Sequence, residues 1–492
     1  MTGTDQKLSV REKIGYSLGD LSANLIFQTL MTFLAFYYTD VSRINPAAAS
    51  TIIFIGGMAG AFFNPVMGAI ADRTKTRWGK FRPWILWTSV PFGLLAILAF
   101  TTPDLGDTGK IIYAQITYIL LVMIYAANNL PYAALSGVLT GDMAERNSMS
   151  SYRFMAVMVA QFVVQVLLLP LVLILGHGDQ AEGFRRTMTV FAIVGTVFFI
   201  ITFLTTKERI VPAPEQRSTL KQDIADLCKN RPWIIMLLLT WLVFITLALK
   251  GGSYIYYFKN YLDVAALAAF LNDIGFIGFM NGLNSALTGM GLTKFEWPQD
   301  PATSAFSLFN ASGIIFSIIG ITLSKKLADH FGKRDVYGYA LFVSTLFLIA
   351  LYFCPPQAIG LVFLAQILHG FFYGITIPIL WAMIADVADY SEWLNNRRAT
   401  AIIFSAMLFG LKAGLSIGGS LVAAILGFYG YNADLAVQSA ETVGGIRLAV
   451  SFHASVPFLL AVCCLFFYEI NKGMETRMET ELKARRAGIT AA

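Results

Sequence analysis

Residues 187–206 read TMTVFAIVGTVFFIITFLTT, twenty consecutive residues without a charged side chain. An α-helix rises about 1.5 Å per residue, so this stretch is long enough to cross the hydrocarbon core of a bilayer, which is about 30 Å thick. Basic residues flank it directly, with Arg186 before it and Lys207 after it. Lipid offers no partners for open backbone groups, so the stretch predicts a transmembrane α-helix.

Comparable apolar blocks recur along all 492 residues, of which 56% are hydrophobic and only 13% are charged. A soluble domain carries about 25% charged residues, and the alternating blocks of about ten residues that mark an outer-membrane barrel do not occur in this sequence. We therefore predict an all-α membrane protein with twelve transmembrane helices in two six-helix, pseudo-symmetric halves. The predicted spans are 14–39, 47–71, 82–101, 111–138, 152–175, 187–206, 232–258, 303–328, 335–353, 357–385, 399–428 and 446–470.

Lysine and arginine predict the orientation of these spans, because cytoplasmic loops carry an excess of basic residues. If the spans alternate in direction, 27 of the 36 basic residues lie on the side of both termini and seven lie on the other side. Two more, Lys250 and Lys412, lie inside spans. We therefore expect a multi-pass protein of the bacterial cytoplasmic (inner) membrane with both termini in the cytoplasm. The net charge of +6 resides in these loops, which argues against a nucleic-acid partner.

Two segments interrupt the succession of spans and predict the domain organisation. Residues 207–231 are charged and contain two prolines, as expected of a cytoplasmic linker between an N-terminal six-helix bundle, 1–206, and a C-terminal one, 232–470. Residues 262–302 form an insert on the external side. A thirteenth span there would put the later basic loops outside, so we expect an external cap or a re-entrant helix. Residues 471–492 form a cytoplasmic tail.

A short charged loop follows the second helix of each predicted half. The first, at 68–80, reads GAIADRTKTRWGK, and the second, at 326–334, reads KLADHFGKR. Each pairs a carboxylate with basic residues at a cytoplasmic helix end, which a general excess of positive charge inside would also produce. Their matching positions favour a repeated gating element. Its predicted residues are Asp72, Arg73, Arg77, Asp329, Lys333 and Arg334.

Polar residues recur on single faces of several spans, although a charged side chain there costs about 2.5–3.5 kcal/mol. Asp20 and Asn24, for example, lie at i and i+4 of the first span, on one helix face. Such charges, amides and aromatic rings suit a polyhydroxylated ligand, because hydroxyls need donors and acceptors and sugar C–H faces stack on rings. The amides could instead join helices, at about 0.6 kcal/mol per bond. The predicted substrate-binding residues are Asp20, Asn24, Tyr125, Asn128, Asn129, Arg153, Lys250, Tyr254, His369, Tyr373 and Trp381.

The sequence lacks the marks of an enzyme. It contains no nucleotide P-loop and no nucleophile elbow, and its four histidines and four cysteines are scattered without metal-ligand spacing. We therefore expect neither catalysis nor a bound metal or cofactor. We also expect the protein to work as a monomer.

Several separated motifs follow one another along the chain. They are Gly19-Asp20, Tyr37-Tyr38-Thr39-Asp40, Arg77-Trp-Gly-Lys80-x-Arg82-Pro83-Trp84, Tyr152-Arg153-Phe154, Ala385-Asp386-Val-Ala-Asp389-Tyr390-x-Glu392 and Lys412 with the glycines after it. Over nearly the whole chain except the insert, this set resembles the glycoside–pentoside–hexuronide:cation symporters of the major facilitator superfamily, the melibiose permease-like proteins.

The resemblance implies the major facilitator fold and a role for each matching residue. Asp20 matches the sugar-binding carboxylate of the family's first helix, and Arg153 matches its sugar-site arginine on helix five. Tyr125 matches an aromatic sugar-site position on helix four. Lys412 matches the helix-eleven lysine near the cation site.

The sequence departs from the family at the cation site. Helix two of the family carries two aspartates in a pattern ending Asn-Asp-Pro, whereas residues 60–65 here read GAFFNP, so that Gly60 and Asn64 stand at the two carboxylate positions. The second sugar-binding aspartate, on helix four, is here Asn129. Hard cations need anionic oxygen ligands, so we expect poor Na⁺ binding. The expected coupling residues are Asp20, Asn64 and Lys412, with a proton as the co-substrate.

These observations favour secondary transport of a glycoside, oligosaccharide or uronide across the bilayer by alternating access, coupled to protons and independent of Na⁺. A transporter of lysolipids or other amphiphiles with the same fold, and an uncoupled facilitator, remain alternatives. A membrane sensor that transports nothing is a third class, which the paired gating loops argue against.

Overall fold

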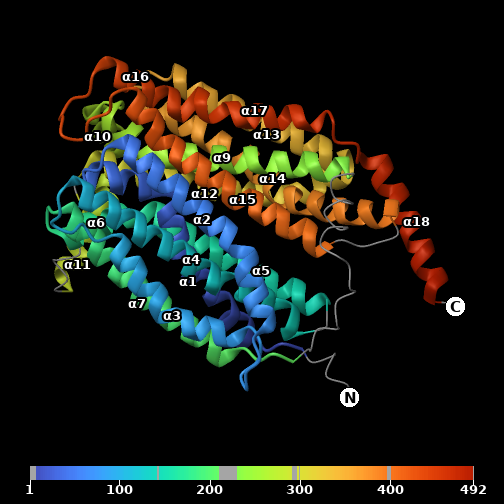
Figure 1. Ribbon diagram of the computed structural model, residues 1–492. Helices are drawn as coiled ribbons and strands as arrows, with labels where there is room; N and C mark the ends of the chain where they lie inside the picture. Colours follow the sequence, from blue (N-terminus) through green and yellow to red (C-terminus); the bar gives the residue numbers. More distant parts are fainter. Residues whose placement is uncertain are drawn as a thin grey trace. The chain divides into compact units, whose positions relative to one another are not determined.

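The chain folds into α-helices that lie one after another along the sequence (Figure 1). The computed structural model describes residues 7–140, 143–209, 230–290, 296–298, 300–395 and 400–490, so most of the predicted linker lies outside the described residues. Twelve helices in these ranges are long and apolar enough to cross a membrane. The predicted class, an all-α membrane protein with twelve spans, is confirmed.

The first six spans occupy residues 10–205. They are α1 (Val10–Phe36) with the π-helical turn η1 (Tyr37–Val41), α2 (Pro46–Arg73), α3 (Arg82–Ala99), α4 (Asp107–Leu139), α5 (Met143–Phe162) continued through η2 (Val163–Leu167) into α6 (Leu168–Gly176), and α7 (Gln180–Thr205).

The later spans begin with α9 (Arg231–Asn260). The others are α12 (Pro301–Phe331), α13 (Lys333–Ala350) with η4 (Leu351–Phe353), α14 (Ile359–Asn395), α15 (Thr400–Phe428), and α16 (Ala440–Leu448) continued through η5 (Ala449–His453) into α17 (Ala454–Leu465). A further helix, α18 (Lys472–Thr490), follows the last span.

Some helices begin or end outside the apolar block from which their span was predicted. The carboxylate of Asp179 accepts hydrogen bonds from the backbone N–H of Ala181 and Glu182, at 2.9 and 3.2 Å. This cap starts α7 at Gln180, so the predicted start at 187 was wrong. The predicted end of the tenth span at 385 was also wrong, because α14 continues through polar residues to Asn395.

The insert forms two short helices, α10 (Val264–Asp273) and α11 (Phe276–Gly289), which meet at an angle of 77°. Gly275 lies at this break with φ of 75°, a left-handed backbone conformation that favours glycine. The pair is apolar enough to count as a thirteenth span if it is taken as one element. The bend is compatible with a cap or a re-entrant helix, which remains a prediction.

The chain divides into two compact units. The first unit contains residues 1–215, 254–310 and 419–443, and the second contains 216–253, 311–418 and 444–492. The predicted boundaries at 206 and 232 remain a prediction.

Glycines allow close helix packing inside the second unit. A Cβ added to Gly320 of α12 would lie 2.1 Å from the carbonyl oxygen of Phe371 in α14. A Cβ on Gly418 of α15 would lie 2.3 Å from the carbonyl oxygen of Ile245 in α9. These backbones touch, so α12 is fixed against α14 and α15 against α9.

Candidate functional site

An ion pair joins α1 to α5 inside the first unit. Nε of Arg153 lies 2.5 Å from Oδ2 of Asp20, and the carboxylate is 4% exposed. Nδ2 of Asn24 donates to Oδ1 of Asp20 at 3.0 Å, because a spacing of four residues puts both side chains on one helix face. The three residues, all predicted for the site, therefore lie together and offer both donors and acceptors.

Two tyrosines form an aromatic wall beside this pair. The rings of Tyr16 and Tyr132 stack with centroids 4.6 Å apart, and each hydroxyl donates to the backbone carbonyl of the other residue. The guanidinium carbon of Arg153 lies 5.9 Å from the centre of the Tyr132 ring. A Cβ on Gly19 would lie 2.6 Å from that ring. The absence of a side chain at Gly19 therefore leaves room for the ring of Tyr132.

The polar residues predicted on α4 have different surroundings. Tyr125 stacks on Phe27 of α1, with ring centroids 5.3 Å apart. Asn128 is buried and donates to the hydroxyl of Thr88 on α3 at 2.8 Å, which makes it a helix-joining residue. Asn129 is half-buried. Of these three residues, Asn128 has the clearest structural role.

A second polar cluster lies inside the second unit. Nζ of Lys250 on α9 lies 2.6 Å from Nε2 of His369 on α14. Nδ1 of His369 lies 2.9 Å from Oγ of Ser344 on α13. The ring of Tyr373 lies parallel to that of His369. The ammonium of Lys250 lies 5.4 Å from the centre of the Tyr373 ring. Three predicted residues thus meet, with Ser344 as an addition.

The other predicted binding residues take part in packing. The ring of Tyr254 meets that of Phe309 edge-on at 5.0 Å. Trp381 packs against the buried hydrophobic core of the second unit. Lys412, which was predicted as a coupling residue, is half-buried on α15.

Asn64 stands at a position where the resemblance to the family predicts an aspartate. Its side chain hydrogen-bonds to carbonyl groups of its own helix. Pro65 has no N–H to donate to the carbonyl of Ala61, one turn earlier. Nδ2 of Asn64 lies 3.4 Å from that carbonyl oxygen and 3.0 Å from the carbonyl oxygen of Gly60. The amide nitrogen therefore serves the backbone of α2.

The first predicted gating loop, residues 68–80, is held by a carboxylate that was not among the predicted site residues. The carboxylate of Glu208, just after α7, accepts from the backbone N–H of Lys80, Phe81 and Arg82 at 2.7–2.9 Å. A carboxylate at a helix N-terminus is favourable, and these amides begin α3. Arg73 is exposed, and the side chain of Asp72 lies outside the described part of the structure.

Two arginines, one inside this loop and one beside Glu208, have partners of their own. The guanidinium carbon of Arg77 lies 5.0 Å from the centre of the Trp78 ring. Arg209 forms a two-pronged ion pair with Glu12 at 2.6 and 2.8 Å. These hydrogen bonds raise the pKa of Arg209 above its usual value. The start of α1 is thereby tied to the end of α7.

The second predicted gating loop, residues 326–334, connects to the last helix. Nζ of Lys333 donates to both carboxylate oxygens of Asp386 on α14 at 2.7 Å and also pairs with Glu475 on α18. The backbone carbonyl of Asp329 accepts from the ammonium of Lys472 at 3.0 Å. Arg334 pairs with the neighbouring Asp335. Neither Glu475 nor Asp386 was among the predicted site residues.

A cluster that we call the outer latch lies at the end of η1, on the side predicted to be external. The carboxylate of Asp40 accepts from Nζ of Lys259 at 2.5 Å, from the hydroxyl of Tyr431 at 2.7 Å and from that of Thr39 at 2.8 Å. The hydroxyl of Tyr256 lies 2.7 Å from that of Thr39. Burial, together with the charge of Asp40, raises the pKa of Tyr431, so it remains a neutral donor.

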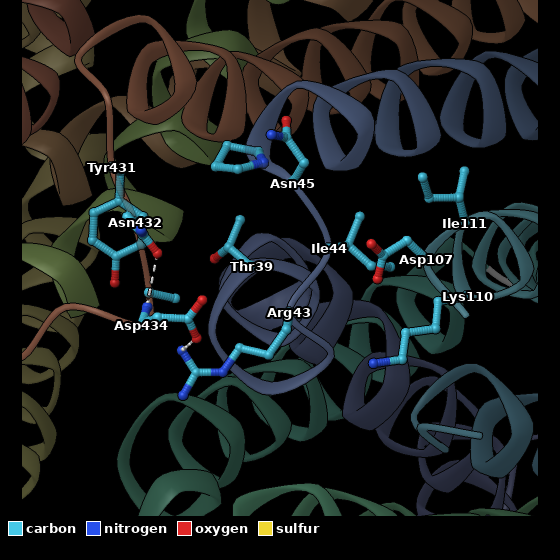
Figure 2. A pocket seen from close by; sticks show the side chains of 12 residues that line it. Thr39, Arg43, Ile44, Asn45, Asp107, Lys110, Ile111, Tyr431, Asn432 and Asp434 are labelled. Atoms are coloured by element: carbon cyan, nitrogen blue, oxygen red, sulfur yellow. Dashed lines mark hydrogen bonds and ion pairs between the residues drawn. The ribbon is translucent and has the colours of Figure 1, made fainter. Parts of the chain in front are cut away.

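A pocket of about 390 Å³ opens beside the outer latch (Figure 2). Thr39 and Tyr431 belong to both, and Arg43 pairs with Asp434 across the pocket wall at 3.1 Å. The latch thus ties the end of the first span to α9 and to the segment after α15. The residues 37–40 were quoted only as a motif, since nothing in the sequence indicates their partners.

No group of three or more histidine, cysteine, aspartate or glutamate side chains that could hold a metal occurs among the residues that the structure describes.

Comparisons with known proteins identify the family and the fold. A family model described as MFS/sugar transport protein matches residues 15–288 and 300–472. The inner membrane symporter YicJ of Escherichia coli (strain K12) is 33% identical over 97% of this chain and 96% of that protein. An isoprimeverose transporter of Lactiplantibacillus pentosus is 28% identical over 97% of this chain and 92% of its own length. A crystal structure of the nucleoside transporter NupG has a TM-score of 0.57 at 14% identity, covers 94% of this chain and all of that one, and supports the fold alone.

Proposed function

Since this chain belongs to the MFS/sugar transport protein family, we propose that it moves a glycoside, oligosaccharide or uronide across the bacterial inner membrane by alternating access. The observation that carries this proposal is the pairing of Asp20 and Arg153 beside the ring of Tyr132. A sugar hydroxyl donates to a carboxylate and accepts from a guanidinium, and its C–H face packs on an aromatic ring. Charge-assisted hydrogen bonds of this kind are stronger than neutral ones.

We also propose that a proton, and not Na⁺, drives this transport. Na⁺ is a hard cation that prefers anionic oxygen ligands. Residues 46–71 of α2 contain no carboxylate, and the side chain of Asn64 is neutral. These features support a helix two without a sodium site.

The test of the substrate class is uptake into proteoliposomes that contain the full-length protein. Three labelled compounds separate the classes: isoprimeverose, a methyl glucuronide and a lysophospholipid. We expect uptake of a sugar compound and none of the lysophospholipid. Uptake of the lysophospholipid alone would overturn the proposal in favour of an amphiphile transporter.

Two variants connect this uptake to the proposed site. Asp20→Asn removes the buried carboxylate charge, and Glu182→Gln removes a half-buried one that pairs with Arg185 and Arg186 on α7. We expect the first variant to lose uptake and the second to retain it. Equal losses would show that the Asp20 pair has no special role in substrate binding.

A further inference from the structure

Two titratable side chains in the second unit share one hydrogen bond. Nζ of Lys250 lies 2.6 Å from Nε2 of His369, which is buried. On the other side of the ring, Nδ1 lies 3.0 Å from the backbone carbonyl oxygen of Ser344 and 2.9 Å from its hydroxyl. Three helices, α9, α13 and α14, therefore position the pair.

The carbonyl of Ser344 decides which nitrogen of His369 carries hydrogen. A carbonyl oxygen only accepts, so Nδ1 is the donor, and Nε2 of the neutral ring keeps its lone pair. Nε2 then accepts from the ammonium of Lys250. A second proton would make both nitrogens donors and break this bond. The pair thus holds one exchangeable proton, with one positive charge when the proton is present and none when it has left.

The surroundings favour a reversible charge. The ammonium of Lys250 lies over the ring of Tyr373, and a cation above an aromatic face is stabilised. The nearest carboxylate along α14, Asp386, is 17 residues from His369, which corresponds to about 25 Å of helix.

The helices around the pair carry other titratable groups. Gly410 and Gly414 of α15 pack against α9. Lys412 lies two residues from each of them, about 200° around the helix, and so its Cβ points away from α9. The other titratable groups on the described residues of the three helices that position the pair are Arg231, Tyr254, Tyr256, Tyr257 and Lys259 on α9, Lys333, Arg334, Asp335, Tyr337 and Tyr339 on α13, and Tyr373, Asp386, Asp389, Tyr390 and Glu392 on α14. His453 lies on η5.

Asp20 is less suited to carry a proton. Its carboxylate accepts from Arg153 and Asn24, so a proton arriving at Oδ2 must displace the guanidinium. Loss of a proton from Lys250 leaves an amine that still donates to Nε2 of His369. We propose that Lys250 and His369 together carry the proton that is co-transported with the sugar. This inference rests on the proposed function and gives it a coupling site.

The first experiment measures the proton directly and needs no sugar. The full-length protein is labelled with ¹⁵N-histidine, and its NMR spectrum is followed from pH 5.5 to 9, with His369→Gln used to assign the resonances. We expect hydrogen on Nδ1 throughout and a single pH-dependent step in the Nε2 resonance. In Lys250→Met, whose side chain cannot donate, we expect His369 to become doubly protonated in acid.

Three results would overturn the inference: hydrogen on Nε2 of the neutral ring, a doubly protonated ring at pH 7 in the unmodified protein, or an Nε2 resonance that is constant over the whole range. Because no substrate is present, the titration decides on the pair even if the proposed sugar transport is wrong.

The second experiment measures the number of protons that enter proteoliposomes with each molecule of isoprimeverose. We expect a ratio of about one for the unmodified protein, since the pair holds one exchangeable proton. The ratio should fall at least fivefold in Lys250→Met and in His369→Gln, whatever the remaining uptake, and should be unchanged in the control His453→Gln. An unchanged ratio in Lys250→Met would contradict the assignment.

Discussion

Replacing Lys259 by methionine tests whether the outer latch holds the protein closed on its predicted external side. Asp40 is 2% exposed and accepts three donors in this cluster, of which Lys259 carries the only positive charge. Methionine keeps most of the length of the lysine and removes the ammonium. The carboxylate then keeps Thr39 and Tyr431 but loses its ion pair.

The expected size of the effect follows from exposure. A hydrogen bond to a charged group contributes about 1.5–3 kcal/mol. Lys259 is 45% exposed, and solvent screens its charge, so we expect the lower end of this range, about 1.5 kcal/mol. That free energy corresponds to about a tenfold shift toward the unlatched state.

A cysteine at Ser307 reports this shift. Ser307 is buried on α12 beside Phe306, whose ring meets that of Phe33 on α1 edge-on at 5.9 Å. In a variant without the native cysteines, we expect Ser307→Cys to react with an impermeant thiol reagent only when α1 and α12 separate. We expect Lys259→Met to raise the labelling rate about tenfold.

Arg43→Met is the matched control. Arg43 pairs with Asp434 in the pocket beside the outer latch, but both side chains are largely exposed, at 49% and 77%. Such exposed pairs contribute about 0–1 kcal/mol, so the labelling rate should change less than about fivefold. A rate for Lys259→Met within the range of Arg43→Met would refute the latch.

Three further predictions concern the other clusters. Asp20→Asn should weaken sugar binding by about ten- to a hundredfold, measured by equilibrium binding, because a hydrogen bond to a charged group is lost; an unchanged affinity would contradict the site. Gly79→Ala should lower the melting temperature, because Gly79 has φ of 114° and its added Cβ would lie 2.4 Å from Glu208, whereas Gly137→Ala, with open space at its Cβ, should not. Glu475→Gln should speed proteolysis of the last helix, since its ion pair with the second gating loop is lost, and equal cleavage of both proteins would argue against docking.

Much of the fold follows from local sequence. A span requires about twenty apolar residues in succession, and that signal needs no partner. The spacing of Asp20 and Asn24 likewise predicted that they share a face, and they form a hydrogen bond. The predicted helix boundaries were wrong where polar residues continue a helix beyond its apolar block. The helix α7, for example, begins at Gln180, because its capping residue Asp179 precedes the apolar block.

The clusters depend on contacts between distant parts of the chain, which periodicity does not reveal. Asp40 meets Lys259 and Tyr431, which lie 219 and 391 positions further along. Lys250 and His369 were each predicted as polar residues within spans, but nothing in the sequence indicated that they touch. Asn64 was predicted as a coupling residue, a role that the structure does not test. The structure shows that its side chain donates to the carbonyl of Ala61, which has lost its usual backbone donor because residue 65 is proline.

The most direct test of proton-driven sugar transport is uptake of isoprimeverose by proteoliposomes with an inward proton gradient and with choline in place of Na⁺. The account predicts accumulation above the external concentration, which a protonophore abolishes and added Na⁺ does not increase. Accumulation that requires Na⁺, or equilibration that is indifferent to both ions, would contradict it.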